Sequence, residues 1–281
     1  MSTARAACAQ QSELDFDVIV VGGGHAGTEA TVAAARAGAR VAMITSSLET
    51  IGQMSCNPAI GGVAKGTVVR EIDALGGVMG RATELASIQF RMLNRGKGPA
   101  VWAPRAQCDR KLYRGAVRGI VESQARVTII PGTVRSLLFA AGDLRMAGVE
   151  TLEGQRVTAR SVVITTGTFL RGMIHIGTDS HVSGGRAGEA ATTHLAEQLA
   201  EIGLVTGRFK TGTPPRIDGR TVDYSVLTRQ ESEIEDFDYS WSAWSGARRS
   251  RWRGSDHASR GAARRDRAGR RPVQDGHPAA H

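Results

Sequence analysis

Cysteine is scarce in this sequence, long apolar runs are missing, and the first residues lack the pattern of a secretory signal. Only three cysteines occur among 281 residues, and no two form a Cys-x-x-Cys pair. This usage argues against a disulfide scaffold and indicates a reducing compartment. No apolar run approaches the ~18 residues of a membrane span, and residues 1–17 hold one arginine and no apolar core. We therefore expect a soluble cytoplasmic protein with no membrane partner.

An excess of basic charge is also missing from most of the chain. The net charge is +9, but residues 240–281 alone carry ten arginines against three acids. The preceding 239 residues carry 26 basic and 24 acidic groups. The basic composition is thus a property of the last segment and does not describe the folded body.

That last segment, residues 240–281, has almost no aliphatic side chains. It contains no Leu, Ile, Met, Phe or Tyr, yet it holds three of the four tryptophans. Such a segment cannot bury enough apolar surface to offset its ordering entropy, so we expect disorder. Two interpretations stay open: a natural Arg-rich tail that contacts RNA or acidic surfaces, or out-of-frame translation of a GC-rich gene.

The body of the chain has the pattern of an α/β fold. Asp17–Val21 is a short β-branched run typical of a strand buried on both faces. A glycine-rich turn follows, then an Ala-rich helix over Thr28–Ala37 and a second strand over Arg40–Thr45. This order is a βαβ unit of roughly 30 residues.

The remaining elements extend this unit into a domain with an antiparallel insertion. The pattern predicts a helix over Gln107–Glu122, a strand over Val127–Ile130, a meander of short strands over Val134–Val157, a buried strand over Ser161–Thr165 and a helix over Ala187–Ile202.

The glycine-rich turn has the spacing Gly22-x-Gly24-x-x-Gly27. In such a turn the first glycine permits the tight bend, the second lets the backbone approach a pyrophosphate, and the third lets helix and strand pack closely. The pyrophosphate then lies at the helix N-terminus, where free amides favour negative charge. The motif lies between a predicted strand and a predicted helix, the context that supports dinucleotide binding. The acid that usually binds a ribose hydroxyl is missing, since no acid follows the second strand before Glu49.

The order of elements favours FAD over NAD. A βαβ unit followed by a meander and a strand that ends in Thr165-Thr-Gly-Thr168 resembles the FAD domain of the disulfide-reductase type. This likeness is at the level of the fold.

A second glycine-rich stretch, residues 52–62, carries a central thiol. Gly61 and Gly62 permit close backbone approach to a planar ligand. Cys56 is flanked by small polar residues, and Lys65 follows nearby, so a lowered pKa and a nucleophilic role are as plausible as a buried structural thiol. By contrast, we expect Cys108 to lie in a helix and pack in the core, and Cys8 to have no role.

Several stretches together resemble the MnmG (GidA) family, the FAD-containing large subunit of the enzyme that builds 5-carboxymethylaminomethyluridine at the wobble position of certain tRNAs. The matching stretches are GGGHAGTEA at 22–30, GQMSCNPAIGG at 52–62, NRGKGPAV at 94–101, GTFL at 167–170, HIG at 175–177, SGGRAG at 183–188 and KTGTPPRID at 210–218.

The resemblance implies a chemistry and a set of partners. In that family reduced flavin, NADH, a one-carbon folate and glycine or ammonium cooperate to alkylate uridine C5 in tRNA. An MnmE-type GTPase partner is required, and the full-length family is expected to form a homodimer. Cys56 matches one of two cysteines proposed to be catalytic, by thiolate addition to the uracil ring.

The resemblance also implies cofactor contacts, and it assigns no residue to a metal. The residues implied for FAD are Gly22, Gly23, Gly24, His25, Ala26 and Gly27 at the pyrophosphate, Val134 through its backbone and Thr192 through its hydroxyl. Thr192 stands where the family usually has Ser. Lys210 and Arg216 meet phosphate in one interpretation and lie in a solvated loop in the other.

We expect four regions along the chain: a flexible N-terminus at 1–14, a Rossmann-like FAD-binding domain at 15–206, the beginning of a truncated inserted domain at 207–239, and the Arg-rich disordered tail at 240–281. Family members are about twice as long, so we expect a fragment that is inactive alone. The alternatives are a stand-alone FAD oxidoreductase of another substrate class and a non-catalytic RNA-binding fragment.

Overall fold

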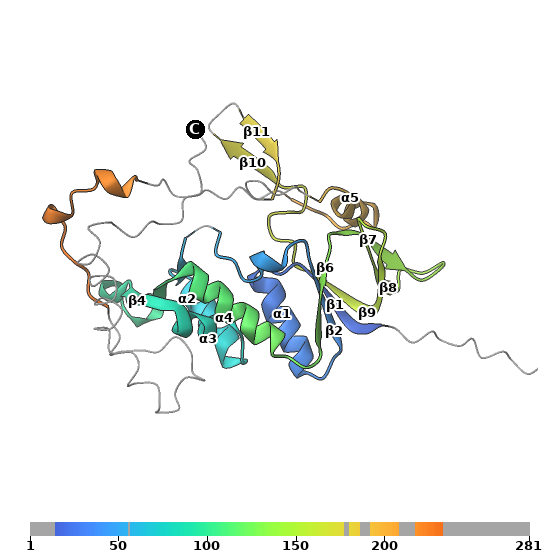
Figure 1. Ribbon diagram of the computed structural model, residues 1–281, viewed down its shortest axis with the longest axis horizontal. Coiled ribbons are helices and arrows are strands. Elements are labelled where there is room, and N and C mark those ends of the chain that lie inside the picture. Colours follow the sequence, from blue (N-terminus) through green and yellow to red (C-terminus); the bar gives the residue numbers. More distant parts are fainter. Residues whose placement is uncertain (1–14, 56, 177–179, 186–191, 208–216, 233–281) are drawn as a thin grey trace, which may run out of the picture.

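A six-stranded mixed sheet organises the larger part of the molecule. The computed structural model describes residues 15–55, 57–176, 180–185, 192–207 and 217–232. The sheet has the strand order β6-β2-β1-β9-β8-β7 (Figure 1). Its strands are β1 (Phe16–Val21), β2 (Val41–Thr45), β6 (Val127–Pro131), β7 (Val134–Phe139), β8 (Met146–Thr151) and β9 (Arg156–Ile164). The expected α/β class with a Rossmann-like unit and an antiparallel meander is confirmed.

The βαβ unit forms the centre of this sheet. β1 pairs in parallel with β2, with Val18 opposite Val41, and α1 (His25–Arg36) connects them. All five residues of β2 are buried. In β1, the strand expected to be buried on both faces, Ile19–Val21 are buried and Phe16–Val18 are half-buried. The helix therefore packs against a fully apolar sheet centre.

One long strand, β9, replaces two expected elements. We expected the meander to end at Val157 and a separate strand to begin at Ser161. The structure instead has β9 running through Arg156–Ile164, antiparallel to β8 in its first part and parallel to β1 from Ala159 onward. A side chain on Gly148 of β8 would overlap the Val157 carbonyl. The absence of that side chain lets the two strands pair closely.

A second layer was not expected from the sequence. It consists of a three-stranded sheet with the order β3-β5-β4 and the helices beside it. The elements are β3 (Ala59–Gly61), α2 (Lys65–Ala74), α3 (Met79–Ala86), β4 (Ser87–Leu93), β5 (Ala103–Cys108) and α4 (Arg110–Glu122). Figure 1 shows α2, α3, α4 and β4 at one end of the molecule, the large sheet at the other, and α1 between them.

The expected helix over Gln107–Glu122 begins later than the pattern suggested. Gln107 and Cys108 end β5, so the expectation that Cys108 is helical is wrong, although it is buried in the core as expected. Asp109 caps α4, because its Oδ1 accepts from the amides of Lys111 at 2.8 Å and Leu112 at 2.9 Å. An aspartate N-cap of this kind fixes where a helix starts.

The last described elements surround the meander. α5 (His194–Glu201) is shorter than the expected helix over Ala187–Ile202, of which residues 187–191 lie outside the described residues. It packs on β7, where the Gln198 side chain exchanges two hydrogen bonds with the backbone of Leu137, at 2.6 and 2.8 Å. β10 (Met173–Ile176) and β11 (Ser180–Ser183) pair as a hairpin. Short 3₁₀ turns occur at Leu48–Thr50, Arg95–Lys97, Pro99–Val101, Gly219–Thr221 and Tyr224–Val226.

Across the described ranges, no helix combines the length and the apolar character needed to cross a bilayer. The expected regions 1–14 and 240–281 both lie outside the described residues.

Candidate functional site

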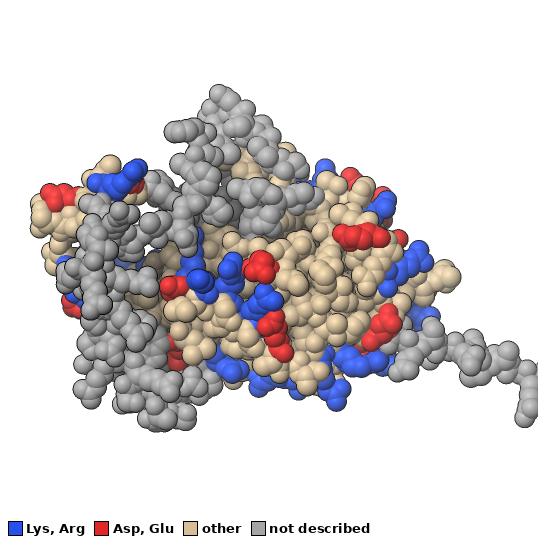
Figure 2. Space-filling view, viewed as in Figure 1, with Lys and Arg blue, Asp and Glu red and all other residues tan. Residues whose placement is uncertain are grey.

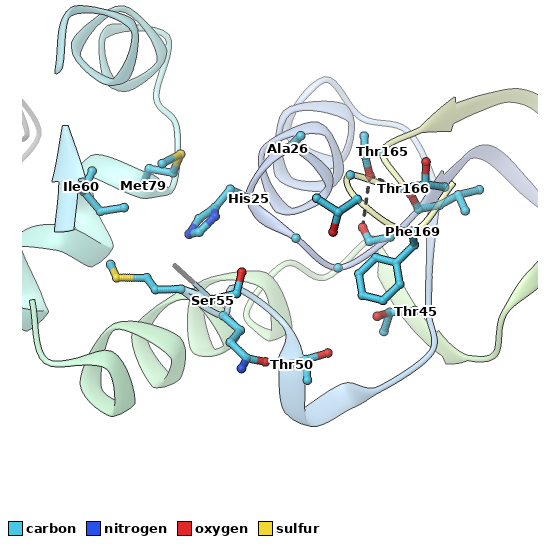
Figure 3. Close-up of a pocket in the computed structure, with 18 of the residues that line it drawn as sticks. His25, Ala26, Thr45, Thr50, Ser55, Ile60, Met79, Thr165, Thr166 and Phe169 are labelled. Atoms are coloured by element: carbon cyan, nitrogen blue, oxygen red, sulfur yellow. Dashed lines mark hydrogen bonds between the residues drawn. The ribbon is translucent and has the colours of Figure 1, made fainter. Parts of the chain in front are cut away.

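A cavity of about 810 Å³ opens where the parallel strands of the large sheet end. Segments from the ends of β1, β2, β6 and β9 line one side of it, and β3, α2 and β5 line the other. Crevices outside the carboxyl ends of parallel strands are the usual ligand sites of open α/β sheets. Figure 3 shows Thr45 and Phe169 on one side of this cavity, Ile60 and Met79 on the other, and His25 between them.

The cavity brings together most of the residues that the sequence singled out for a cofactor. Its lining includes Gly22, Gly23, Gly24, His25 and Ala26 from the glycine turn, together with Val134 at the start of β7 and Thr192 before α5. Val134 and Thr192 are far from the turn in sequence and reach the same space through the fold. Gly27 does not line the cavity.

The turn is called here the glycine loop (residues 22–27). Its glycines are required for different structural reasons. Gly22 has φ +108°, and an added Cβ would lie 2.6 Å from the Thr165 carbonyl oxygen. A Cβ on Gly27 would overlap the carbonyl of Gly22, so this glycine lets α1 pack on β1. A Cβ on Gly24 would meet nothing within 4 Å. Gly24 thus leaves space for a ligand to approach the backbone, whereas Gly22 and Gly27 serve the turn itself.

The N-terminus of α1 places backbone amides at the glycine loop. Gly24 is the N-cap and supplies no side-chain cap, and the first turn contains no acid. The first intrahelical bond is from the amide of Thr28 to the carbonyl of Gly24, at 2.9 Å. The amides of the first turn before Thr28 therefore lack intrahelical acceptors. Donors of this kind, together with the helix dipole, favour a phosphate group, so the residues present fit a pyrophosphate.

Hydroxyl groups occupy the end of β2, where an acid was missing from the sequence. Thr45, Ser46 and Thr50 line the cavity there. Glu49, the first acid after the strand, does not line the cavity, and its Oε1 lies 3.4 Å from Arg118 on α4. Any sugar bound beside β2 therefore meets hydroxyls in place of a carboxylate.

Glu29, in the second turn of α1, connects the glycine loop to α3. Its carboxylate accepts from the Val78 amide at 2.8 and 3.0 Å and from the Met79 amide at 2.7 Å. Burial raises the pKa of Glu29, and the nearby carboxylate of Asp73 adds to the rise, while the two amide bonds oppose it. Because Met79 lines the cavity, this contact fixes part of its wall.

Of the three cysteines, Cys108 lies among the described residues, and Cys56 and Cys8 do not. Burial raises the pKa of the Cys108 thiol to about 12, so this group is an inert part of the core. Cys56 lies outside the described residues, but its neighbours Ser55 and Asn57 line the cavity. Cys8 lies outside the described residues as well.

Two other residues singled out from the sequence, Lys210 and Arg216, also lie outside the described residues. Sequence reasoning anticipated this wall at Gly61 in β3, which lines the cavity, but it missed the parts formed by α2, α3 and β5, which include Met79 and Arg105. No local motif marks Arg105, because its position depends on the pairing of strands.

Comparison with known proteins agrees with this geometry. Residues 17–276 match the family described as Glucose inhibited division protein A, abbreviated GIDA. The match runs past Asp218, where the last matching stretch recognised in the sequence ends, and into the Arg-rich segment.

Two crystal forms of Aquifex aeolicus GidA are similar to this chain. Form II is 48% identical with a TM-score of 0.74, over 80% of this chain and 37% of that chain. Form I is 48% identical with a TM-score of 0.75, over 82% of this chain and 38% of that chain. The chain thus spans somewhat more than a third of the length of these GidA chains. On the family match and this level of identity, the chain belongs to the GidA family.

Proposed function

We propose that the cavity binds FAD, with the glycine loop at the pyrophosphate. The observation that carries this proposal is the convergence of Gly22–Ala26, Val134 and Thr192 on one cavity, where the uncapped start of α1 meets open space at Gly24. The amides of His25 and Ala26 would hold the pyrophosphate, and the hydroxyls after β2 would meet the adenosine ribose. FAD bound there would supply redox chemistry.

We propose further that the chain takes part in forming the 5-carboxymethylaminomethyl group on the wobble uridine of tRNA, with NADH, a one-carbon folate and an MnmE-type GTPase partner, in a homodimeric full-length protein. Family membership supports this proposal. The chain's own contribution would be to orient the uracil ring beside the cavity and to exclude water from it, through the apolar side chains of Ile60 and Met79.

Cys56 is the proposed nucleophile. Its thiolate would add to C6 of the uracil, leaving an electron pair at C5 that attacks the one-carbon unit of the folate. The π electrons of the carbon–nitrogen double bond of that unit would pass to the folate nitrogen. Loss of the C5 proton would then expel the thiolate. The position of Ser55 and Asn57 in the cavity lining supports this role.

A titration of FAD into the purified chain, followed by flavin fluorescence, tests the cofactor proposal. Wild-type chain should bind one FAD, and Gly24→Val should weaken binding at least tenfold because the new side chain would fill the open space. Gly119→Val on α4 is the matched control, since a Cβ there also meets nothing within 4 Å. Equal FAD affinity in the wild type and Gly24→Val would refute the assignment of the glycine loop.

The variant Cys56→Ala tests whether Cys56 acts as the nucleophile or contributes to FAD binding. FAD affinity should not change, whereas tRNA modification by the same protein completed to the length of its GidA relatives should be lost. Undiminished modification would remove Cys56 from the mechanism.

Residues 240–281 have two interpretations, a natural Arg-rich tail and out-of-frame translation of a GC-rich gene. Sequencing the coding DNA from codon 231 onward tests out-of-frame translation. A different frame that encodes a long chain with apolar periodicity and a further cysteine would support it, and the lack of such a frame would contradict it.

A further inference from the structure

The lining of the cavity contains two fully charged side chains, and both are cations. Lys65 at the start of α2 and Arg105 in β5 line it, whereas no Asp or Glu occurs among the described residues that do. A cavity with charge of one sign concentrates ligands of the opposite sign. The glycine loop contributes amides to the same space, so the cavity has two separate groups of anion-binding donors.

Strand pairing places Arg105 in a row of basic residues. Arg105 is the register partner of Gly61 on one side and of Arg91 on the other. Directly opposed residues of antiparallel strands point to the same face, with Cβ atoms about 4.5–5.5 Å apart, and like charges in such positions are destabilising. The neighbouring register row, Ile60, Ala106 and Phe90, is buried in the core, so the row with Arg91 and Arg105 lies on the opposite face.

The charges of the two cavity cations can be compared with those of the acids that the structure describes. Within the described part of the chain, neither Lys65 nor Arg105 lies within ion-pairing distance of an acid. Arg118 on α4 differs, because it contacts Glu122 at 2.7 Å and Glu49 at 3.4 Å. Figure 2 shows blue and red side chains interspersed over much of the outer surface. With no described acid paired to them, Lys65 and Arg105 can both contact an anionic ligand in the cavity.

The local backbone brings Lys65 close to the same row. The Gly62 amide donates to the Pro104 carbonyl at 3.0 Å, and the Gly66 amide donates to the Gly62 carbonyl at 2.8 Å. A side chain on Gly66 would overlap the Pro104 carbonyl. The start of α2 is thus packed directly against β5 beside Arg105.

We propose that Lys65 and Arg105, continued by Arg91, form a phosphate-binding subsite for the backbone of a single-stranded RNA segment. This inference rests on the proposed function and identifies where the RNA that carries the target nucleotide docks. The pyrophosphate of a dinucleotide is already matched to the start of α1. Lys65 is exposed, and Arg91 extends the row beyond the cavity lining, as binding a chain of phosphates requires and binding one small anion does not. RNA is recognised in single-stranded segments whose bases can be splayed into a pocket.

The test uses the full chain and a fluorescently labelled ten-residue oligouridylate as the probe. Binding is measured at several salt concentrations for the wild type and Lys65→Met/Arg105→Gln, together with the FAD dissociation constant of each. We expect oligouridylate affinity to fall about tenfold near 0.1 M salt. The salt slope should shrink by about 1.4, since each phosphate contact to a single strand contributes roughly 0.7. The FAD dissociation constant should change less than threefold.

Controls separate charge from folding and from the proposed function. Lys111→Met/Arg114→Gln on α4 removes the same charge outside the cavity lining and should lose much less affinity. Lys65→Arg/Arg105→Lys should restore binding if charge is what matters, and circular dichroism verifies folding of each variant.

Three results would overturn the subsite. They are an equal loss in the α4 control, a wild-type chain that does not bind oligouridylate, or a loss of FAD affinity without a loss of RNA affinity. The last result would assign both cations to the cofactor. A wild-type chain that does not bind FAD would refute the proposed function, whereas intact FAD binding with unaltered RNA binding in the variant would refute the subsite alone.

Discussion

The two ends of the cavity are held in place by different forces. At the glycine loop, backbone approaches so closely that a single methyl group on Gly27 would overlap a carbonyl. At the opposite wall, Lys65 and Arg105 pair with no acid of the described segments, and Arg105 is the register partner of a second arginine, Arg91. Packing therefore defines the first end, and uncompensated charge defines the second.

This difference predicts opposite responses to substitution. Changes at Gly22 and Gly27 of the glycine loop should damage the fold, because close packing there tolerates no added volume. Changes at the cations should leave the fold intact or improve it, because functional sites retain unfavourable contacts at a cost in stability. Glu29 lies between these cases, since it joins α1 to α3 by hydrogen bonds.

The largest effect is expected for Gly27→Val. The new side chain would overlap the Gly22 carbonyl and separate α1 from β1, which should cost at least about 3 kcal/mol of unfolding free energy. Urea unfolding followed by circular dichroism measures this loss. Gly24→Ala is the matched control and should cost no more than about 1 kcal/mol, the scale of an N-cap change. Equal stability of the two variants would show that the glycines are interchangeable.

An intermediate effect is expected for Glu29→Ala. Removing the carboxylate leaves the amides of Val78 and Met79 without their acceptor, which should cost about 1–2 kcal/mol. The same urea experiment measures it. Hydrogen exchange at these two amides should accelerate, and unchanged exchange would contradict the capping role.

A smaller effect is expected in the pH dependence of Glu29. Its folded-state pKa is raised above the ordinary 4.5, chiefly by burial. A raised pKa means that the protonated form favours the fold, so this contribution is full below about pH 4.5 and is lost as pH rises through the raised value. The stability of the wild type relative to Glu29→Gln should therefore increase as the pH is lowered from 7 toward 4.5. A difference that is flat or decreases over this range would contradict the burial argument.

The smallest effect, of opposite sign, is expected for Arg105→Gln. Removing one of two directly opposed arginines should stabilise the protein by about 0.2–1 kcal/mol, measured as a rise in thermal midpoint at low salt. Arg114→Gln on α4 should change stability by less than about 0.5 kcal/mol in either direction. Destabilisation by Arg105→Gln would mean that Arg105 serves packing and would remove the contrast between the two ends.

The two ends of the cavity also differ in how well the sequence predicts them. The glycine loop could be placed because its function depends on neighbours in sequence, a strand before it and a helix after it. The α/β class could be predicted because it too depends on the order of neighbouring strands and helices along the chain. The sequence predicts two strands where the structure has β9. The change from an antiparallel to a parallel partner along one strand leaves no signal in the local periodicity of the sequence.

In the opposite wall, the approach of Gly61 to a ligand was predicted, but the contribution of β5 could not be, because it depends on register. Arg105 reaches the cavity only through its pairing between Gly61 and Arg91. Cys108 was assigned to a helix because the helical pattern of α4 continues upstream of Asp109, where the cap ends it. Both residues are positioned by contacts between segments far apart in the chain.

Hydrogen exchange at the start of α1, measured with and without FAD, tests the central claim most directly. The amides of His25 and Ala26, in the first turn of α1, are the donors assigned to the pyrophosphate. Saturating FAD should slow exchange in the peptide that contains them at least tenfold, while peptides from the exposed surface of α4 should not change. FAD that binds without slowing exchange at His25 and Ala26 would contradict the account, since the cofactor would then lie elsewhere.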